Sequence, residues 1–138
     1  MAETKENWVL ETAKVYEEKL ATQIRKKNTS VKSNYPKMLI KARIDFVFFV
    51  VSLYFGVDKN CFYEKKRQGG LPSNFSEIRG FAFALLKQRY NYSNEMISIH
   101  TKFSKNWIAR CIYKFSISEN SEFEKCELIS KQIANSNL

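Results

Sequence analysis

The chain has 138 residues, of which 44% are hydrophobic and 27% charged, the balance expected of one soluble globular domain. Only 4 Gly and 2 Pro are present, which argues against a turn-rich β-sandwich or β-barrel and favours helices. The 23 Lys and Arg exceed the 14 Asp and Glu, and the resulting net charge of +9 favours polyanionic partners.

The positive charge is concentrated in the middle of the chain. Residues 23–114 contain 18 basic and five acidic residues, a net charge of +13, whereas residues 1–22 and 115–138 each carry a net charge of −2. This segregation indicates a basic surface that binds a polyanion. A solvated lysine-rich surface without a partner is the alternative interpretation.

Cysteine usage and hydropathy predict a cytoplasmic protein. The three cysteines are odd in number and form no C-x-x-C pair, which is typical of free thiols in a reducing compartment. The N-terminus has no apolar signal segment. The longest apolar stretch covers residues 46–57, which is shorter than the roughly 20 residues needed to cross a bilayer. We therefore expect no membrane association.

Two long helices are predicted in the N-terminal part. The first covers residues 5–26, and its apolar stripe comprises Trp8, Ala13, Val15, Tyr16, Leu20 and Ile24. A polar loop follows to Pro36. The second helix covers residues 37–56, with Gly56 as its C-terminal cap. A β-strand over residues 46–51 is the alternative for this aromatic and β-branched run, but the length of the apolar stretch favours a helix.

Capping residues mark the starts of the remaining predicted helices. Asp58 begins a short helix over residues 60–67, and Asn74 with Glu77 forms a capping box for a helix that ends near residue 89. Ser93 caps a helix over residues 94–101, and Ser104 caps another over residues 105–115. A second capping box over residues 121–124 begins the last helix, whose inward side chains are Phe123, Cys126, Ile129 and Ile133.

Residues 93–115 have the pattern of a helix-turn-helix. Ser98 supplies a small side chain where the two helices cross, and Phe103 fills the corner of the turn over residues 102–104. The predicted buried stripe of the second helix is Trp107, Ile108, Cys111, Ile112 and Phe115, and its exposed face is Lys105, Asn106, Ala109 and Arg110. Asn and Arg side chains match the edges of adenine and guanine in the major groove. A helical hairpin that binds nothing is the alternative.

Residues 44–115 resemble the C-terminal DNA-binding domain of the bacterial replication initiator DnaA, a member of the Trp-repressor-like helix-turn-helix group. An apolar run over residues 49–57 is followed by a basic segment over residues 62–70 and by a helix over residues 79–87 that opens with Arg and alternates Ala with large apolar residues. The helix-turn-helix follows. The family's Arg-Asp-His run is absent from residues 103–108, and Trp107 stands where the family has Thr.

The resemblance implies a set of DNA contacts. Lys65, Lys66, Arg67 and Arg79 would approach the minor groove or the phosphates, whereas Lys105, Asn106 and Arg110 would read the major groove. Lys102 and Ser104 in the turn complete the candidate DNA-binding residues. The initiator's ATPase domain has no counterpart here, and no G-x-x-x-x-G-K-[ST] loop occurs, so we expect no ATP binding.

Some of these residues have simpler interpretations. Arg79 could pair with Glu77 or Glu64, and Lys41 with Arg43 could form a solvated face. Tyr90, Tyr92 and Phe103 are typical of a core, although they could stack on single-stranded nucleic acid.

Catalysis and metal binding are not indicated. His100 is the only histidine, and it has no Cys/His cluster with metal-ligand spacing around it. Asp45 and Asp58 are the only aspartates, and no pair of carboxylates suits acid–base chemistry. We therefore expect no enzyme activity, no cofactor, no metal and no small-molecule substrate.

These observations predict an all-α protein with a helix-turn-helix core of the DnaA C-terminal, Trp-repressor-like type. The core would cover residues 37–117, preceded by an N-terminal helix and linker over residues 1–36 and followed by a C-terminal helix over residues 118–138. The predicted partner is double-stranded DNA, and either terminal helix could form a homodimer. The first alternative is a protein-interaction module that binds an acidic or replication-related partner. RNA binding is the second.

Overall fold

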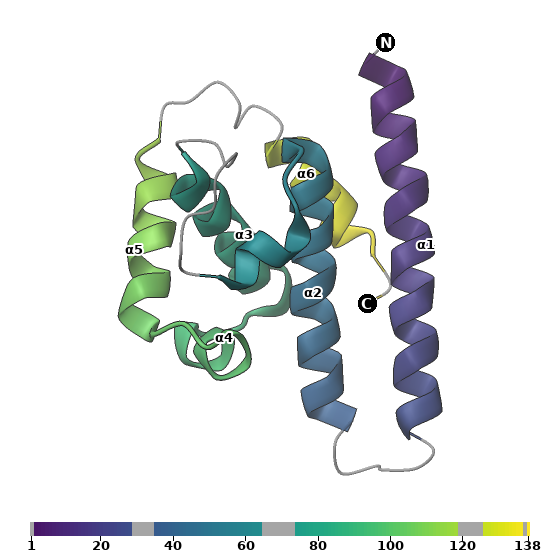
Figure 1. Ribbon diagram of the computed structural model, residues 1–138, viewed down its shortest axis with the longest axis horizontal. Helices are drawn as coiled ribbons and strands as arrows, with labels where there is room; N and C mark the ends of the chain where they lie inside the picture. Colours follow the sequence, from purple (N-terminus) through teal and green to yellow (C-terminus); the bar gives the residue numbers. More distant parts are fainter. Residues whose placement is uncertain (1, 29–34, 65–73, 119–125, 137) are drawn as a thin grey trace.

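The computed structural model describes residues 2–28, 35–64, 74–118, 126–136 and 138. Within these ranges it describes the backbone alone for residues 2–7, 27, 28 and 35, and both backbone and side chain for the others. The described residues form helices and no strands, which confirms the all-α prediction (Figure 1). In chain order the elements are α1 (Ala2–Asn28), α2 (Tyr35–Phe55), the 3₁₀ helix η2 (Lys59–Tyr63), α3 (Phe75–Tyr90), α4 (Asn94–Thr101), α5 (Lys105–Ser116) and α6 (Cys126–Ala134).

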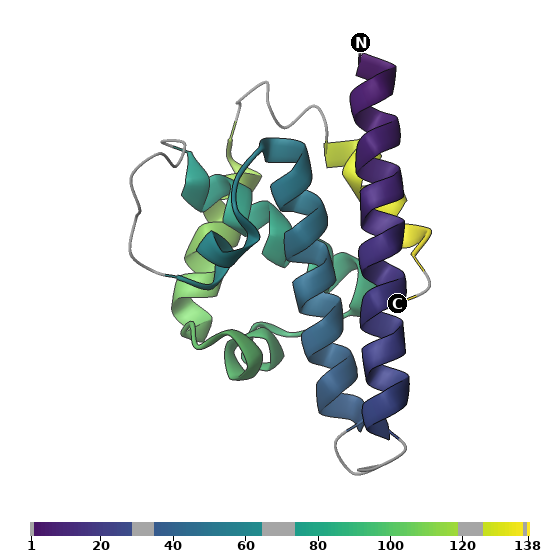
Figure 2. The same cartoon turned by 45° about the vertical axis from the view of Figure 1, so that its right-hand side comes forward.

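Helices α1 and α2 lie side by side along most of their length (Figures 1 and 2). Val9, Ala13 and Ile24 of α1 are buried, and the ring of Tyr16 stacks on Phe49 with centroids 4.1 Å apart. The predicted inward positions of Trp8 and Val15 are wrong, since these side chains are 54% and 67% exposed. The face that packs on α2 runs instead through Val9, Ala13, Tyr16, Leu20 and Ile24, which keeps the helical period.

Helix α2 passes through the centre of the molecule. Its apolar residues are buried or half-buried all round the helix, which explains why the sequence there shows no polar face. The buried ones include Ile44, Phe46, Val47, Phe48, Val50 and Val51. The helix continues through residues 46–51, so the strand alternative is excluded. Gly56 follows with a φ of +67° and ends α2, as predicted.

The predicted cap at Asp58 is present, whereas the predicted capping box at Asn74 does not form. The Asp58 carboxylate accepts a hydrogen bond of 2.9 Å from the Asn60 amide, but η2 ends at Tyr63, before the predicted end. Asn74 precedes α3, yet its side chain makes no capping hydrogen bond. Its φ of −97° and ψ of 24° lie outside the extended conformation that such a cap requires. The Asn74 carbonyl instead accepts from the amides of Glu77 and Ile78 at 3.0 and 3.2 Å.

The C-terminal segment packs against helices from earlier in the chain. Ile129 and Ile133 of α6 are buried as predicted, and Cys126 is half-buried. The Tyr54 hydroxyl lies 2.9 Å from Oε1 of Gln132, which joins α2 to α6. The capping box over residues 121–124 and Phe123 fall outside the described residues. Within the described ranges, no helix has the length and apolarity required to span a membrane.

Candidate nucleic-acid interface

Helices α4 and α5 form the predicted hairpin, and both of its capping serines are confirmed. The Ser93 hydroxyl accepts a hydrogen bond of 3.1 Å from the Met96 amide, and the Ser104 hydroxyl accepts one of 3.1 Å from the Trp107 amide. Lys102 ends α4 in the left-handed conformation, with a φ of 70°, and its amide donates to the Ser98 carbonyl at 3.2 Å. These local bonds set the direction in which α5 leaves the turn.

Phe103 fills the corner between the two helices, as predicted. Its side chain is 2% exposed, and its ring centroid lies 4.4 Å from that of Trp107 and 6.1 Å from that of Phe83. The Ser98 hydroxyl donates to the Phe103 carbonyl. The turn is therefore held by packing against α3 and α5 and by a hydrogen bond from α4.

A close backbone approach fixes α5 against α3. A Cβ atom at Gly80 would lie 1.9 Å from the Cys111 carbonyl oxygen and 2.5 Å from its carbonyl carbon. Only glycine permits this approach, because any side chain would overlap the backbone of α5. No local sequence pattern predicts this role for Gly80, which interrupts a run of good helix-forming residues.

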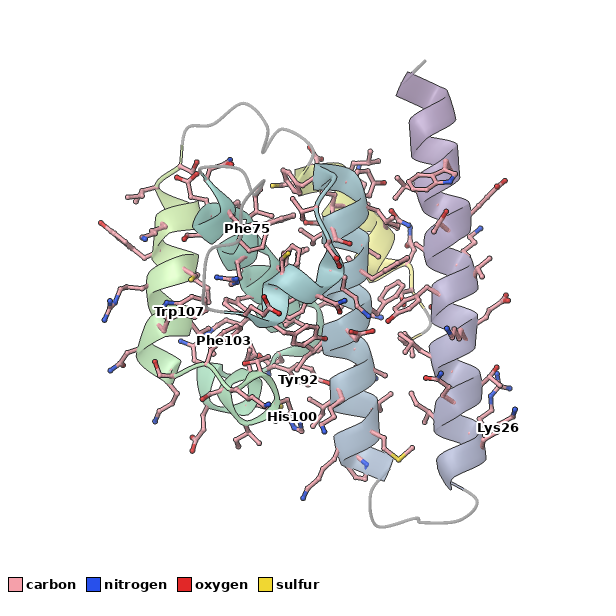
Figure 3. All side chains as sticks on the ribbon, in the orientation of Figure 1. Lys26, Phe75, Tyr92, His100, Phe103 and Trp107 are labelled. Carbon is pink, nitrogen blue, oxygen red and sulfur yellow. The ribbon has the colours of Figure 1, made fainter. Side chains whose placement is uncertain are left out.

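Arg79 is buried, which corrects its predicted DNA contact. The side chain is 4% exposed, and its guanidinium group donates to the carbonyls of Cys61, at 2.8 Å, and Glu64. The guanidinium carbon lies 4.7 Å from the ring centre of Phe75 and 4.8 Å from that of Trp107. Figure 3 shows these two rings on different helices, α3 and α5. Burial lowers the pKa of Arg79 below its usual value.

Arg79 binds the backbone at Glu64, directly before the basic side chains of residues 65–67. Lys65, Lys66 and Arg67 lie outside the described residues, so the predicted contacts there have no structural description. The last described residue before them is Glu64, whose carbonyl is bound by Arg79. Arg79 thus joins the start of the basic segment to the first turn of α5 through Trp107.

The predicted DNA-facing side of α5 is exposed. Ile108 and Cys111 are buried, and Trp107, Ile112 and Phe115 are half-buried. The exposed residues are Lys102, Ser104, Lys105, Asn106, Ala109 and Arg110. Among the described residues, the side chains of Lys102, Lys105, Asn106 and Arg110 make no hydrogen bond or ion pair. These polar groups are therefore available to a ligand.

The aromatic residues considered for base stacking belong to the interior. Tyr92 is 7% exposed and Tyr90 stacks on it, with ring centroids 5.4 Å apart. Arg43, expected on a solvated face, donates to the Tyr92 hydroxyl at 3.2 Å and lies over the ring of Tyr90. With Phe103 also buried, these three rings offer no exposed stacking platform.

A polar network and a cavity lie between α1, α2, η2 and α4. The Asp45 carboxylate accepts from the hydroxyls of Tyr16 and Tyr63 and pairs with Lys59 at 3.0 Å. Burial and the Asp45 charge raise the pKa of Tyr63. The adjoining cavity has a volume of about 400 Å³, and its wall includes Lys41, Asp45, Tyr63 and His100. The described residues contain no group of three His, Cys, Asp or Glu placed to hold a metal ion.

Comparisons of the chain with protein-family models, with curated proteins and with solved structures found no match.

Proposed function

We propose that this protein binds double-stranded DNA through α4 and α5, with α5 in the major groove. One observation carries the proposal: Lys105, Asn106 and Arg110 are exposed on the first two turns of a rigidly held helix, with no partner among the described residues. The N-terminal part of the second helix is the part that meets base edges in helix-turn-helix proteins.

The exposed groups suggest a division of roles. Lys102 and Ser104 in the turn would bind phosphates, which set affinity and register without reading sequence. Asn106 and Arg110 would read adenine and guanine edges, and Lys105 would add a further contact near the groove. The exposed side chains of Lys102, Lys105, Asn106 and Arg110 can turn towards DNA without first leaving the protein interior. The Ser104 hydroxyl can donate to a phosphate while it still accepts from the Trp107 amide.

The DnaA-like type is part of this proposal. Its support is the order of elements: an apolar helix, a short helix that leads to a basic segment, the helix α3 that begins at Phe75 and contains Arg79, and then the helix-turn-helix. On this basis the protein would act as a regulator of transcription or replication that occupies DNA without ATPase activity. Nucleoid association would follow from duplex binding.

Fluorescence anisotropy with a labelled duplex of roughly 30 base pairs tests the proposal. We expect binding at about 50 mM salt that weakens roughly 10³-fold by about 200 mM, because several phosphates would be neutralised. Absence of binding at the lower salt concentration would contradict the proposal, since a central segment with 18 basic residues should bind at least non-specifically.

A homodimer through α1 would place two such units on DNA. Trp8 and Val15 leave apolar surface exposed on α1, seven residues apart on one side of the helix. Sedimentation velocity of the protein and of the double variant W8S/V15S tests this. We expect a dimer that the substitutions convert to a monomer, and a monomeric starting protein would contradict it.

The second candidate is a protein-interaction module on the same helices. It is favoured by exposed apolar side chains: Ile99 on α4, which is 72% exposed, Tyr113 on α5, which is 63% exposed, and Ile117, which is 60% exposed. An acidic or replication-related partner would suit the net charge. The variant Y113S/I117S separates the candidates, because DNA binding through the first turns of α5 should survive these substitutions.

A further inference from the structure

Three basic side chains meet where the start of α2 lies beside the end of α4. Lys37 and Lys41 are exposed on the first turns of α2, and His100 is half-buried near the end of α4. Lys41 and His100 line the same cavity, and Figure 3 places His100 between the two helices. We call these three residues the α2 shoulder.

The charge of the α2 shoulder is not neutralised by the described part of the chain. There, neither lysine nor His100 makes a hydrogen bond or an ion pair. The carboxylate on this side, Asp45, is already engaged by Lys59 and by two tyrosine hydroxyls. Burial and the positive charges of Lys41 and Lys37 lower the pKa of His100 below its usual 6.5.

The α2 shoulder includes His100 of α4, the first helix of the hairpin proposed to bind DNA. In a helix-turn-helix, the first helix crosses the phosphate backbone while the second enters the groove. His100 lies near the end of that first helix, two residues before Lys102, which leads through the turn to Lys105. Basic residues therefore occur at the start of α5, in the turn, at the end of α4 and on the first turns of α2, and α4 contacts both α5 and α2.

We propose that Lys37, Lys41 and His100 form a second phosphate-binding surface, which holds the DNA strand that passes beside α4 while α5 occupies the major groove. The ligand is the phosphodiester backbone, whose charges suit two lysines without a carboxylate partner among the described residues and a histidine that gains its charge beside a phosphate. This inference rests on the proposed function and extends the contact surface beyond the hairpin.

The α2 shoulder also makes DNA binding depend on pH. A phosphate beside His100 opposes the two lysines and favours the imidazolium form, so binding takes up a proton and affinity rises as pH falls. The charged groups that act on His100 are Lys41 and Lys37 on α2. Asp45 on α2, Tyr63 on η2 and the uncharged Gln23 on α1 line the same cavity as His100. Tyr63 stays protonated because its pKa is raised, and His100 is the only histidine in the chain.

The double variant K37A/K41A tests the proposal by duplex anisotropy over a range of salt concentrations. We expect a loss of affinity of about tenfold or more and a decrease of up to about 1.8 in the slope of log K against log salt, about 0.9 for each phosphate that is no longer neutralised. The matched control K14A/K19A removes the same charge from exposed positions on α1, which lies across α2 from α5 (Figure 1). We expect the control to bind within about twofold of the wild type.

The variant H100Q tests the histidine separately. Wild-type affinity should rise between about pH 7.5 and about pH 5.5, and H100Q should lose this rise while remaining folded by circular dichroism. If K37A/K41A binds as tightly as K14A/K19A, the second surface is disproved and the proposed function stands. If the wild type binds no duplex at low salt, the proposed function fails together with the inference.

Discussion

The guanidinium carbon of Arg79 lies 4.8 Å from the ring centre of Trp107, so a buried cation of α3 packs against the first turn of α5. The same guanidinium donates to the carbonyls of Cys61 and Glu64 at the end of η2. Arg79 thereby links three elements around the hairpin. Its proposed contribution to DNA binding is to position α5 and the start of the basic segment.

Replacing Arg79 should therefore affect folding first. We expect R79A to lower the free energy of unfolding by about 2–4 kcal/mol, because the variant lacks two hydrogen bonds from a charged donor and the packing of that donor on aromatic rings. R110A is the matched control, since Arg110 is exposed, and it should change stability by less than about 0.5 kcal/mol while weakening DNA binding. Urea unfolding monitored by circular dichroism measures both. An R79A protein of unchanged stability that bound DNA poorly would restore Arg79 as a direct contact.

Gly80 should tolerate no side chain. G80A adds a Cβ atom within 1.9 Å of the Cys111 carbonyl oxygen, so α5 must move and the free energy of unfolding should fall by about 1–3 kcal/mol. This decrease should appear although Ala favours helices by about 1 kcal/mol over Gly.

The control for this substitution is G56A. Gly56 has a φ of +67° but open space around its Cβ position, so only the cost of left-handed backbone applies. We expect both variants to lose stability and only G80A to lose DNA affinity when both remain folded at low temperature. Equal DNA affinity of G80A and the wild type would argue against α5 as the DNA-binding helix.

Substitutions on α5 should separate sequence reading from phosphate binding. N106A and R110A should each weaken binding to a selected preferred sequence by about 1–3 kcal/mol and change binding to random duplex much less. K102A should weaken both by the same factor and reduce the salt slope by about 0.9. Anisotropy with the two duplexes provides the comparison. A uniform decrease in affinity for N106A and R110A would mean that α5 does not read bases.

Alkaline pH should destabilise the protein through Tyr63. Burial and the Asp45 carboxylate raise the pKa of Tyr63 above its ordinary 10.0, so the folded state retains a proton that the unfolded state releases. The contribution of Tyr63 is fully present below about pH 10 and is lost as pH rises further.

The variant Y63F should show a smaller fall in stability between about pH 9 and about pH 11 than the wild type, as measured by urea unfolding. The control Y113F changes a tyrosine that is mostly exposed, and it should keep the wild-type pH profile. Identical profiles for Y63F and the wild type would show that Tyr63 is not held in its protonated form.

The hairpin could be predicted closely because its signals are local. Ser93 and Ser104 cap the helices that follow them, and Phe103 between them is the apolar residue that a turn of this length buries. The exposure of Asn106 and Arg110 followed from helical periodicity once the start of α5 was set.

Where the structure differs from the sequence-based predictions, the cause is packing between segments that are distant in the chain. Arg79 has the same charge whether it faces DNA or the interior, and its burial depends on aromatic rings of α3 and α5 and on carbonyls of η2. The role of Gly80 depends on where α3 crosses α5, which no local pattern records. Trp8 and Val15 each precede by one residue a position on the contact face of α1, Val9 and Tyr16. One residue turns a helix by about 100°, so the predicted side chains point away from that face.

Mapping the DNA-binding surface by NMR tests the central claim most directly. Two-dimensional amide spectra recorded during titration with duplex DNA should show the largest shift changes for Lys102 to Arg110, with further changes at Lys37, Lys41 and His100. The amides of α1 between Trp8 and Lys19 should change little. The largest changes on α1 or α6, with α5 unaffected, would contradict a DNA-binding role for the helix-turn-helix.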